Sequence, residues 1–490
     1  FCLLRASGLL PPAPPHSPPS PSLICREGPR QLACPASPMS FSEVHRETLG
    51  HFSPDGGHLA GVSNNRILVR DARTLRLAEV FVCAAKVERI EWSADSEFLL
   101  AEVARPGLVQ IWSLRDSSWA CRIEEGIAGV ARARWGPASR HVFVVADFGL
   151  YLAAWALEDG RRAAQIRYPK YPHRGLAFGR EGRCLALLCR SDCRDSVAVH
   201  GCDGEFSRLA EFPLRHDCAD LAWAPNDAAI ILWERPAHSP HFLWYSPAGE
   251  LLSQLGDCGP LRCACPAPSA RLLAAGCLDG GLQLVSGDAM QPLARLEHDL
   301  GTALAEAGDD EVLVLREEDP AAEGAPVGYV RLPPGGLRVP VERRPAEVPV
   351  DSDGVPRQGV GTLSWSPDER YVATRHDGMP TAVWVWDTGR LALAALLLHR
   401  APVRAMAWGS PSQPQGGGGS ARLAVSTADS VLHFWWRGGS ARLPCPLPAA
   451  RLQWRCDGAA VLLQERQGVC VCGTGGLQLR DAGQGGAGRA

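Results

Sequence analysis

The chain has 490 residues, of which 46% are hydrophobic and 21% charged, with a formal net charge of −3 at pH 7. This composition is that of an ordinary globular protein and excludes fibrous or wholly disordered chains. The balanced charge gives no basic surface for nucleic acid. The longest apolar run, 391–398, is far shorter than the ~20 residues of a membrane-spanning helix, so we expect no membrane span.

The first 38 residues are rich in Pro and Ser and include the run PPAPPHSPPSPS. Such a segment cannot bury a hydrophobic core, and no signal peptide is expected because Leu9 and Leu10 lead directly into prolines. We therefore interpret 1–38 as a disordered leader, either a translated leader or gene-model extension, or a genuine disordered tail. Met39 is the expected start of the native chain.

From residue 52 onward the sequence repeats an aromatic residue, a turn and a short apolar run. These aromatic anchors are Phe52, Trp92, Trp135, Phe178, Trp223, Trp365, Trp408 and Trp454, and Cys265 is predicted to hold the same place in its repeat. Successive anchors, Cys265 included, lie 40, 43, 43, 45, 42, 100, 43 and 46 residues apart. All but the 100-residue interval are close to the ~40–45 residues of a WD40 unit, so the sequence predicts about nine repeats.

Each clear repeat has the pattern of two strands joined by a tight turn, as in FSPDGGHLAGV from Phe52. Pro54, Pro225 and Pro367 preset the backbone of this turn, and the Asp or Asn beside each proline bonds its own backbone. A further apolar strand ends about twenty residues past the anchor. In four repeats this strand ends in a tryptophan: Trp112, Trp155, Trp244 and Trp386.

Small four-stranded sheets bury both faces only when they pack side by side around an axis, which predicts an all-β WD40-type β-propeller over 39–475. Residues 41–44 are expected to supply the outer strand of the last blade, whose own sequence lacks a fourth strand. One wide ring is favoured because there is a single closing strand and no linker near the middle; two smaller rings are the alternative. The acidic, Pro-rich stretch 298–357 is interpreted as a degenerate blade with an exposed insertion, and 476–490 as a flexible Gly-rich tail.

The common catalytic motifs are missing from the sequence. Lys86 and Lys170 are not followed by Ser or Thr, as a phosphate-binding P-loop requires, and neither G-x-S-x-G nor H-E-x-x-H occurs. His173, His216 and His376 are interpreted as single loop residues without a carboxylate partner. We therefore predict no enzyme activity, no catalytic residue, no cofactor and no small-molecule substrate.

The cysteines are also predicted to carry no chemistry. The pairs Cys189/Cys193, Cys263/Cys265 and Cys470/Cys472 lack the spacing of a tetrahedral zinc site and are interpreted as thiols packed in the core. No metal site is expected. The sequence singles out no binding residues either; the loops at the rim of the ring are the expected contact surface.

Several repeats carry distinctive motifs in a fixed order: IEWSADS (90–96), GLVQIWSL (107–114), EEGIAG (124–129), YPK (168–170) and GMPTAVWVWD (378–387). From Met39 to about residue 475 the chain resembles the family of the centrosomal WD-repeat protein WRAP seventy-three, also called WD-repeat protein eight. It departs from the family pattern at 298–357, in the glycine insert at 415–419 and in the N-terminal extension.

The resemblance implies a non-catalytic scaffold in the cytoplasm and cytoskeleton, at centrosomes, centriolar satellites and spindle poles. It implies a coiled-coil centriolar-satellite protein as partner, together with other centrosomal or spindle-pole proteins. The roles that follow from it are microtubule minus-end anchoring, mitotic spindle organisation and cilium assembly.

Two other functions compete with this interpretation. A substrate receptor of a cullin-type ubiquitin ligase would use a Trp-Asp-x-Arg motif, but after Trp386-Asp387 the required position holds Gly389, and Arg390 comes one residue late. A translation-associated propeller that touches RNA would need a rim of Lys and Arg, which the near-neutral charge does not indicate.

Overall fold

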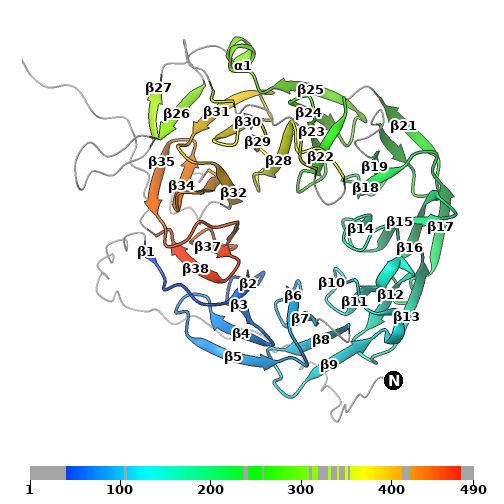
Figure 1. The fold of residues 1–490 in the computed structure, drawn as a ribbon. Coiled ribbons are helices and arrows are strands. Elements are labelled where there is room, and N and C mark those ends of the chain that lie inside the picture. The colour runs from blue at the N-terminus through cyan, green and yellow to red at the C-terminus, as the bar shows by residue number, and fades with distance from the viewer. Residues whose placement is uncertain are drawn as a thin grey trace, which may run out of the picture.

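The computed structural model describes residues 40–103, 107–234, 241–256, 259–307, 312–317, 329–332, 339–341, 348–350, 354–410 and 420–475. Within these ranges the strands form nine sheets that follow one another around a single ring (Figure 1). We call the sheets blades one to nine in chain order. The WD40-type propeller with one wide ring is therefore confirmed, and the two-ring alternative is wrong.

The first five blades are regular, each with four strands joined in sequence order. Blades one to three contain β2 (Thr48–Phe52), β3 (His58–Ser63), β4 (Arg66–Asp71) and β5 (Leu77–Val82); β6 (Val87–Trp92), β7 (Phe98–Val103), β8 (Leu108–Ser113) and β9 (Ala120–Glu124); β10 (Arg132–Trp135), β11 (His141–Val145), β12 (Tyr151–Ala156) and β13 (Arg162–Arg167). Blades four and five contain β14 (Leu176–Phe178), β15 (Cys184–Ser191), β16 (Arg194–Gly201) and β17 (Arg208–Pro213); β18 (Cys218–Trp223), β19 (Ile230–Glu234), β20 (Phe242–Tyr245) and β21 (Leu251–Leu255).

The remaining blades include the two that depart from this plan, the seventh and the ninth. Blades six and seven contain β22 (Leu261–Pro266), β23 (Leu272–Cys277), β24 (Gly281–Ser286) and β25 (Gln291–Glu297); β26 (Leu313–Glu317), β27 (Tyr329–Leu332), β28 (Val360–Trp365), β29 (Tyr371–His376), β30 (Ala382–Asp387) and β31 (Ala392–Leu398). Blades eight and nine contain β32 (Val403–Gly409), β33 (Arg422–Thr427), β34 (Val431–Trp436) and β35 (Gly439–Pro444); β36 (Arg451–Trp454), β37 (Ala460–Glu465), β38 (Gly468–Gly473) and β1 (Ser40–Phe41).

The middle strands of the blades are apolar on both faces. Every residue of β20 (FLWY) and of β34 (VLHFWW) is buried, whereas the outer strand β5 (LAEVFV) buries only Phe81. A middle strand is covered by a neighbouring blade on each face, so it does not alternate between apolar and polar residues as a half-exposed strand does. This packing between blades makes up the hydrophobic core.

The repeating aromatic anchors lie at or near the end of the innermost strand of their blades. Each tryptophan anchor in the described chain donates its indole N–H to a backbone carbonyl of the preceding blade. These bonds join Trp92 to His51 (3.1 Å), Trp135 to Glu91 (3.0 Å), Trp223 to Ala177 (3.0 Å), Trp365 to Cys265 (3.1 Å), Trp408 to Ser364 (3.0 Å) and Trp454 to Ala407 (3.0 Å). The anchors therefore connect blades as well as fill them.

The anchor predicted at Cys265 is displaced by one residue. Pro266 pairs with Leu273 across β22 and β23, just as Trp92 pairs with Leu99 in blade two, and Cys265 pairs with Ala274. Pro266 therefore holds the anchor position. The sequence did not reveal this because an imino acid lacks the aromatic ring by which the other repeats are recognised.

The predicted closing strand is confirmed. In β1, Ser40 and Phe41 pair with Gly473 and Cys472 of β38. His45 extends the contact, since its N–H and carbonyl both bond Val469, at 2.9 and 3.0 Å. The N-terminal part of the described chain thus supplies the fourth strand of blade nine, on the outer side of β38 in Figure 1.

The interpretation of 298–357 as a degenerate blade is wrong. Strands β26 and β27 form no sheet of their own: β26 runs parallel to β31 and β27 pairs with β26, so together they widen blade seven to six strands. Helix α1 (Leu300–Ala307) leads into them. Two strands alone would leave both faces of an isolated sheet in water, whereas an existing blade edge pairs their backbone.

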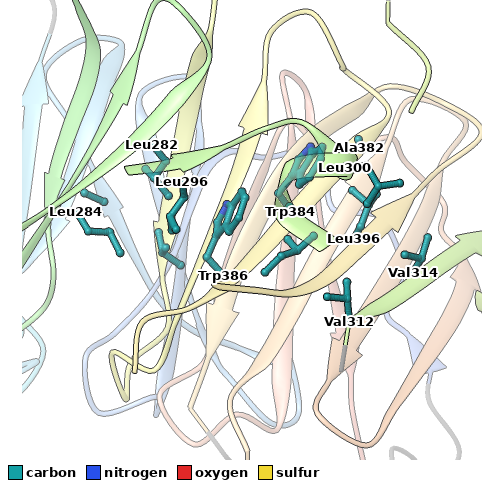
Figure 2. Close-up of a cluster of buried hydrophobic side chains, with 14 of the residues drawn as sticks. Leu282, Leu284, Leu296, Leu300, Val312, Val314, Ala382, Trp384, Trp386 and Leu396 are labelled. Carbon is teal, nitrogen blue, oxygen red and sulfur yellow. The ribbon is translucent and has the colours of Figure 1, made fainter. Parts of the chain in front are cut away.

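Figure 2 shows how this added segment is held. Trp384 and Trp386 of β30 point to one face, where Leu282 and Leu284 of blade six, Leu300 of α1 and Val314 of β26 pack near them. Both tryptophans are fully buried, with ring centroids 5.7 Å apart. The segments predicted to be disordered or flexible, 1–38 and 476–490, and the glycine insert at 415–419 lie outside the described residues. In the described part of the chain, no helix is long and apolar enough to cross a bilayer.

Candidate interaction surface on the third blade

Four large apolar side chains are exposed at one edge of blade three, and we call them the blade-three patch: Ile127, Phe148, Leu150 and Tyr168. Ile127 is fully exposed, and Phe148, Leu150 and Tyr168 are 99%, 45% and 48% exposed. Scattered single apolar residues are normal on a protein surface, whereas a contiguous group of them is a candidate interaction surface.

The patch comes from three connections that the antiparallel sheet brings together. One precedes β10 and contains a short 3₁₀ helix, Gly126–Ala128; another joins β11 to β12 and contains Asp147–Gly149; the last follows β13. In a four-stranded antiparallel sheet, the start of the first strand, the turn between the second and third strands, and the end of the fourth strand all lie at the same end of the strands. These connections belong to the cyan strands β10 to β13 in Figure 1.

The three connections touch each other. The backbone N–H of Tyr168 donates to the carbonyl of Leu150 at 3.2 Å. A Cβ atom on Gly129 would lie 2.1 Å from Asp147 Oδ2, and one on Gly149 would lie 2.8 Å from the carbonyl oxygen of Pro169. Glycine is therefore required at both contacts, and the patch is one continuous surface.

Two aromatic residues of the patch have left-handed backbone conformations. Phe148 has a φ of 59° and Tyr168 also has a φ of 59°. Bulky L-residues rarely adopt this region, which costs about 1–2 kcal/mol per residue because Cβ approaches the carbonyl oxygen. Strain of this kind persists where the surroundings impose it, and it collects at functional sites.

A buried glutamate fixes the EEGIAG segment. The side chain of Glu125 is fully buried and accepts hydrogen bonds from Tyr151 Oη at 2.9 Å and from Trp155 Nε1 at 2.6 Å. Its remaining charge is paired with Arg162, whose Nη2 lies 2.6 Å from Oε2. A buried carboxylate with every oxygen paired holds one position, so Ile127 next to it stands on a rigid base.

A buried lysine fixes the YPK segment in the same way. Lys170 Nζ lies 2.5 Å from Asp195 Oδ2, from Asp217 Oδ1 and from the carbonyl oxygen of Cys218, and its side chain is only 2% exposed. Three acceptors satisfy the three protons of an ammonium group. Tyr168, two residues earlier, is therefore held in place from inside the ring.

The charges around the patch are arranged in two groups. Arg167, which precedes Tyr168, is exposed, and so are Asp192 and Arg194 at the turn between β15 and β16; the N–H of Arg190, just before this turn, bonds the Tyr168 carbonyl at 2.9 Å. On the Ile127 side, Glu124 is exposed three residues earlier in the chain, and Asp147 lies against Gly129. The Tyr168 side thus exposes two arginines and one aspartate, and the Ile127 side carries two carboxylates.

A first cluster of titratable residues corrects the interpretation of His216 as a lone histidine. His216 Nδ1 lies 2.5 Å from Glu234 Oε1, and His241 Nδ1 lies 2.6 Å from Glu234 Oε2. Ligands around a zinc ion are separated by about 3.3 Å, given Zn–N distances near 2.0 Å. The shorter separations are those of hydrogen bonds, so the glutamate connects two histidines at the edge of blade five.

A second cluster, Glu317, His399 and His433, lies fully buried between blades seven and eight. Glu317 pairs with Arg442 at 2.8 Å and accepts the Arg400 N–H at 3.1 Å, so both of its oxygens are engaged. Burial, and then the charge of Arg442, lowers the pKa of His433 to about 3. A cationic guanidinium on the carboxylate opposes a metal ion at the same place, and the cluster serves to attach β26 to blade eight.

The other residues singled out in the sequence have structural roles. His376 Nδ1 accepts the Gly378 N–H at 3.0 Å, and the described cysteines are all free. Burial raises the pKa of Cys189 and Cys263 to about 12, as expected for packed thiols. Cys193 is exposed instead, because it lies in the left-handed turn between β15 and β16 with a φ of 60°.

Only part of the blade-three patch was visible in the sequence. The segments EEGIAG and YPK stood out as motifs, but no binding role was predicted for them. Phe148 was missed, because an aromatic residue between apolar strands is usually read as core. A signal was present: Asp-Phe-Gly follows the strand HVFVV where the repeat requires a turn.

Nine blades closed by an N-terminal strand, with anchor residues at about 43-residue spacing, define the chain as a WD40-type β-propeller. The chain is 33% identical over 465 residues to the mouse (Mus musculus) WD repeat-containing protein WRAP73, covering 89% of this chain and 96% of that protein. It belongs to the WRAP73 family of WD-repeat proteins. No family model matches the chain. Among solved structures, it is similar to the C-terminal WD40 domain of Sif2, with a TM-score of 0.47 and 12% identity over 89% of this chain and 99% of that one.

Proposed function

We propose that this protein is a non-catalytic scaffold in the cytoplasm and cytoskeleton, positioned at centrosomes, centriolar satellites and spindle poles. There it anchors microtubule minus ends and supports mitotic spindle organisation and cilium assembly. The single observation that carries the proposal is the 33% identity to WRAP73 across 89% of the chain. Its partners would be a coiled-coil centriolar-satellite protein and other centrosomal or spindle-pole proteins.

The geometry agrees with a scaffold. Propellers present loops on a rigid ring, and binding residues gather on such loops. The blade-three patch has this character, since its apolar side chains are exposed while buried Glu125 and Lys170 hold the connections from inside. The Trp386-Asp387 pair acts within the fold instead. The Asp387 carboxylate accepts the N–H groups of Gly389 and Arg390, at 3.0 and 3.1 Å, and so closes the turn after β30.

The test is to follow the tagged full chain in dividing cells together with γ-tubulin, and to deplete the endogenous protein. We expect enrichment at γ-tubulin foci and spindle poles, with defective poles after depletion. A uniform cytosolic signal with intact poles would contradict the proposal. Recovery of a cullin ligase adaptor, or salt-dependent binding to RNA, would favour one of the two competing functions.

A further inference from the structure

We infer that the blade-three patch is a docking site for an amphipathic α-helix of a partner protein. The apolar face of the helix would cover Phe148, Ile127, Leu150 and Tyr168, and its carboxylates would face Arg167 and Arg194. This inference rests on the proposed scaffold function and deepens it, because it names the surface and the kind of partner.

The patch is built for binding rather than for folding. Phe148 is 99% exposed, so its ring contributes almost nothing to the core of this chain. Its backbone is nevertheless held at a φ of 59°, an arrangement that projects an aromatic ring at an energetic cost. Exposed aromatic residues on rigid supports lose little entropy on binding, which is why they dominate binding energies.

The backbone hydrogen bonds of the patch favour a partner helix over an added partner strand. An added strand needs free backbone donors at a sheet edge, whereas a helix satisfies its own backbone groups and binds through side chains. The N–H groups of Gly149, Leu150 and Tyr168 donate to Ala146, Asp147 and Leu150, at 3.2, 3.4 and 3.2 Å. These three donors are already used within the patch and are not free to pair with an added strand.

The exposed charges around the patch indicate which charge the partner helix carries. Arg167 next to Tyr168 is exposed, Arg194 is exposed at the turn between β15 and β16, and Arg190 before this turn is held by Asp195 and Asp217 at 3.4 and 3.5 Å. Complementary charges orient a partner and raise its association rate. A helix with acidic residues beside one end of its apolar stripe would therefore be preferred over a basic one, and that acidic end would lie toward blade four.

The first experiment maps what covers the patch. Benzoylphenylalanine replaces Phe148 in the full-length chain in cells, and the photo-crosslinked peptide is sequenced by mass spectrometry. The same probe at Leu209, 60% exposed on β17 of blade four, is the matched control. We expect crosslinks at 148 to one segment with apolar residues at i, i+3, i+4 and i+7 and flanking Asp or Glu.

The second experiment measures binding of that segment as a synthetic peptide to the purified full-length chain. Phe148→Asn, a residue that tolerates left-handed backbone, should weaken binding about tenfold or more with an unchanged melting temperature, while Leu209→Asn should change neither. Arg167→Glu with Arg194→Glu should weaken it several-fold, with the larger loss at low salt. The peptide should gain helical circular dichroism on binding.

Four results would overturn the inference. In the crosslinking experiment, these are a crosslink from position 148 only to this chain itself (residues 1–38 or a second copy), a crosslink to a basic or extended segment, and no crosslink beyond that of the Leu209 control. In the binding experiment, it is equal peptide binding by the native chain and the Phe148→Asn variant. If the peptide binds as described while the protein stays away from centrosomes, the docking site stands and the proposed location fails. If the protein is centrosomal but Phe148→Asn leaves partner binding unchanged, the location stands and the docking site fails.

Discussion

The junctions between blades fall into two groups. In the described structure, six of them carry an indole hydrogen bond from a tryptophan anchor to the preceding blade, while the junctions that enter blades one, four and six have Phe52, Phe178 and Pro266 at the anchor position. The second group uses other contacts. Phe143 and Phe178 pack edge to face at 5.2 Å between blades three and four.

The contacts that join neighbouring blades therefore differ from one junction of the ring to the next. The junction between blades nine and one has the N–H of Phe52 bonded to Gln453 Oε1 at 3.1 Å instead of an indole, and it also carries β1. The junction between blades six and seven has the indole bond of Trp365 and a second bridge through His298. Local stability follows such contacts, so the ring should open first where the fewest side chains cross.

The largest effect is expected where the ring closes. A chain that begins at Met39 should melt like the full chain, because surface changes away from packing alter stability by less than about 0.5 kcal/mol. A chain that begins at Leu49 lacks β1 and leaves β38 with an open edge, which favours loosening and aggregation. Thermal melts and size exclusion chromatography compare the two. An unchanged, monomeric Leu49 chain would show that β1 does not hold the ring.

Two substitutions of Trp135 distinguish the contribution of packing from that of the indole hydrogen bond at a blade junction. Trp135→Ala should lower the free energy of unfolding by about 3–5 kcal/mol, because it leaves a cavity between blades two and three. Trp135→Phe keeps most of the ring but removes the bond to the Glu91 carbonyl, and should cost about 1–2 kcal/mol. Denaturant titrations measure both. An unchanged free energy of unfolding in Trp135→Phe would mean that the indole N–H contributes nothing beyond packing.

The bridge at His298 should make the junction between blades six and seven sensitive to acid. His298 Nδ1 lies 2.8 Å from the Gly280 carbonyl and Nε2 lies 2.7 Å from Thr374 Oγ1, which also accepts the Trp386 indole N–H at 3.0 Å. Burial, and then the charge of His376, lowers the pKa of His298 from 6.5 to about 3. Below pH 6.5 the unfolded chain therefore takes up a proton that the folded chain excludes.

The stability from this histidine is complete above about pH 6.5 and falls as the pH drops toward 3. At pH 5.5 the loss should be about 1.4 kcal/mol relative to neutral pH. Melts of the native chain and of His298→Gln between about pH 7.5 and 5 test this. The variant starts less stable but should lose less on acidification. Parallel pH curves for the two proteins would assign the acid sensitivity to other groups.

The smallest effect is expected from a substitution that converts a junction with a phenylalanine anchor into one with a tryptophan anchor. The Trp135 indole donates to the carbonyl of Glu91, the residue before the anchor of the preceding blade. In Phe178→Trp, the new indole would face the equivalent carbonyl, that of Arg134. A new hydrogen bond contributes about 0.5–1.5 kcal/mol, so the melting temperature should rise by a few degrees at most. Phe178→Leu is the control without a donor. A lower melting temperature for Phe178→Trp would show that this junction lacks room for the larger ring.

Much of the fold could be predicted from the residues alone. Anchor spacing indicated the repeat number, the SPDG-like turns placed the first hairpin, and the missing fourth strand after Cys472 pointed to residues 41–44. These features depend on short stretches of chain, whose backbone preferences and periodicity are encoded locally. The anchor at Pro266 was missed by one position because its signal lies in pairing register, which a sequence does not display.

The candidate surface was less predictable. EEGIAG and YPK were visible as motifs, yet their meeting with Phe148 depends on three connections at one edge of blade three. Likewise Glu234 accepts hydrogen bonds from both His216 and His241, which lie 18 and 7 residues away from it in the chain. Contacts between residues far apart in the chain arise only when the sheets assemble, so these sites could not be found by spacing.

A ring of about nine sheet repeats and its closing strand thus follow from the order of residues, because alternation, turn residues and anchor spacing are local properties. Assembly of the ring was needed to show that β26 and β27 widen blade seven, since β26 pairs with β31, a strand far away in the sequence. Assembly also determines which apolar residues remain in water. Phe148 and Phe143 lie five residues apart in one blade, but Phe143 is 1% exposed and Phe148 99%, because a neighbouring blade covers one and nothing in this chain's described residues covers the other.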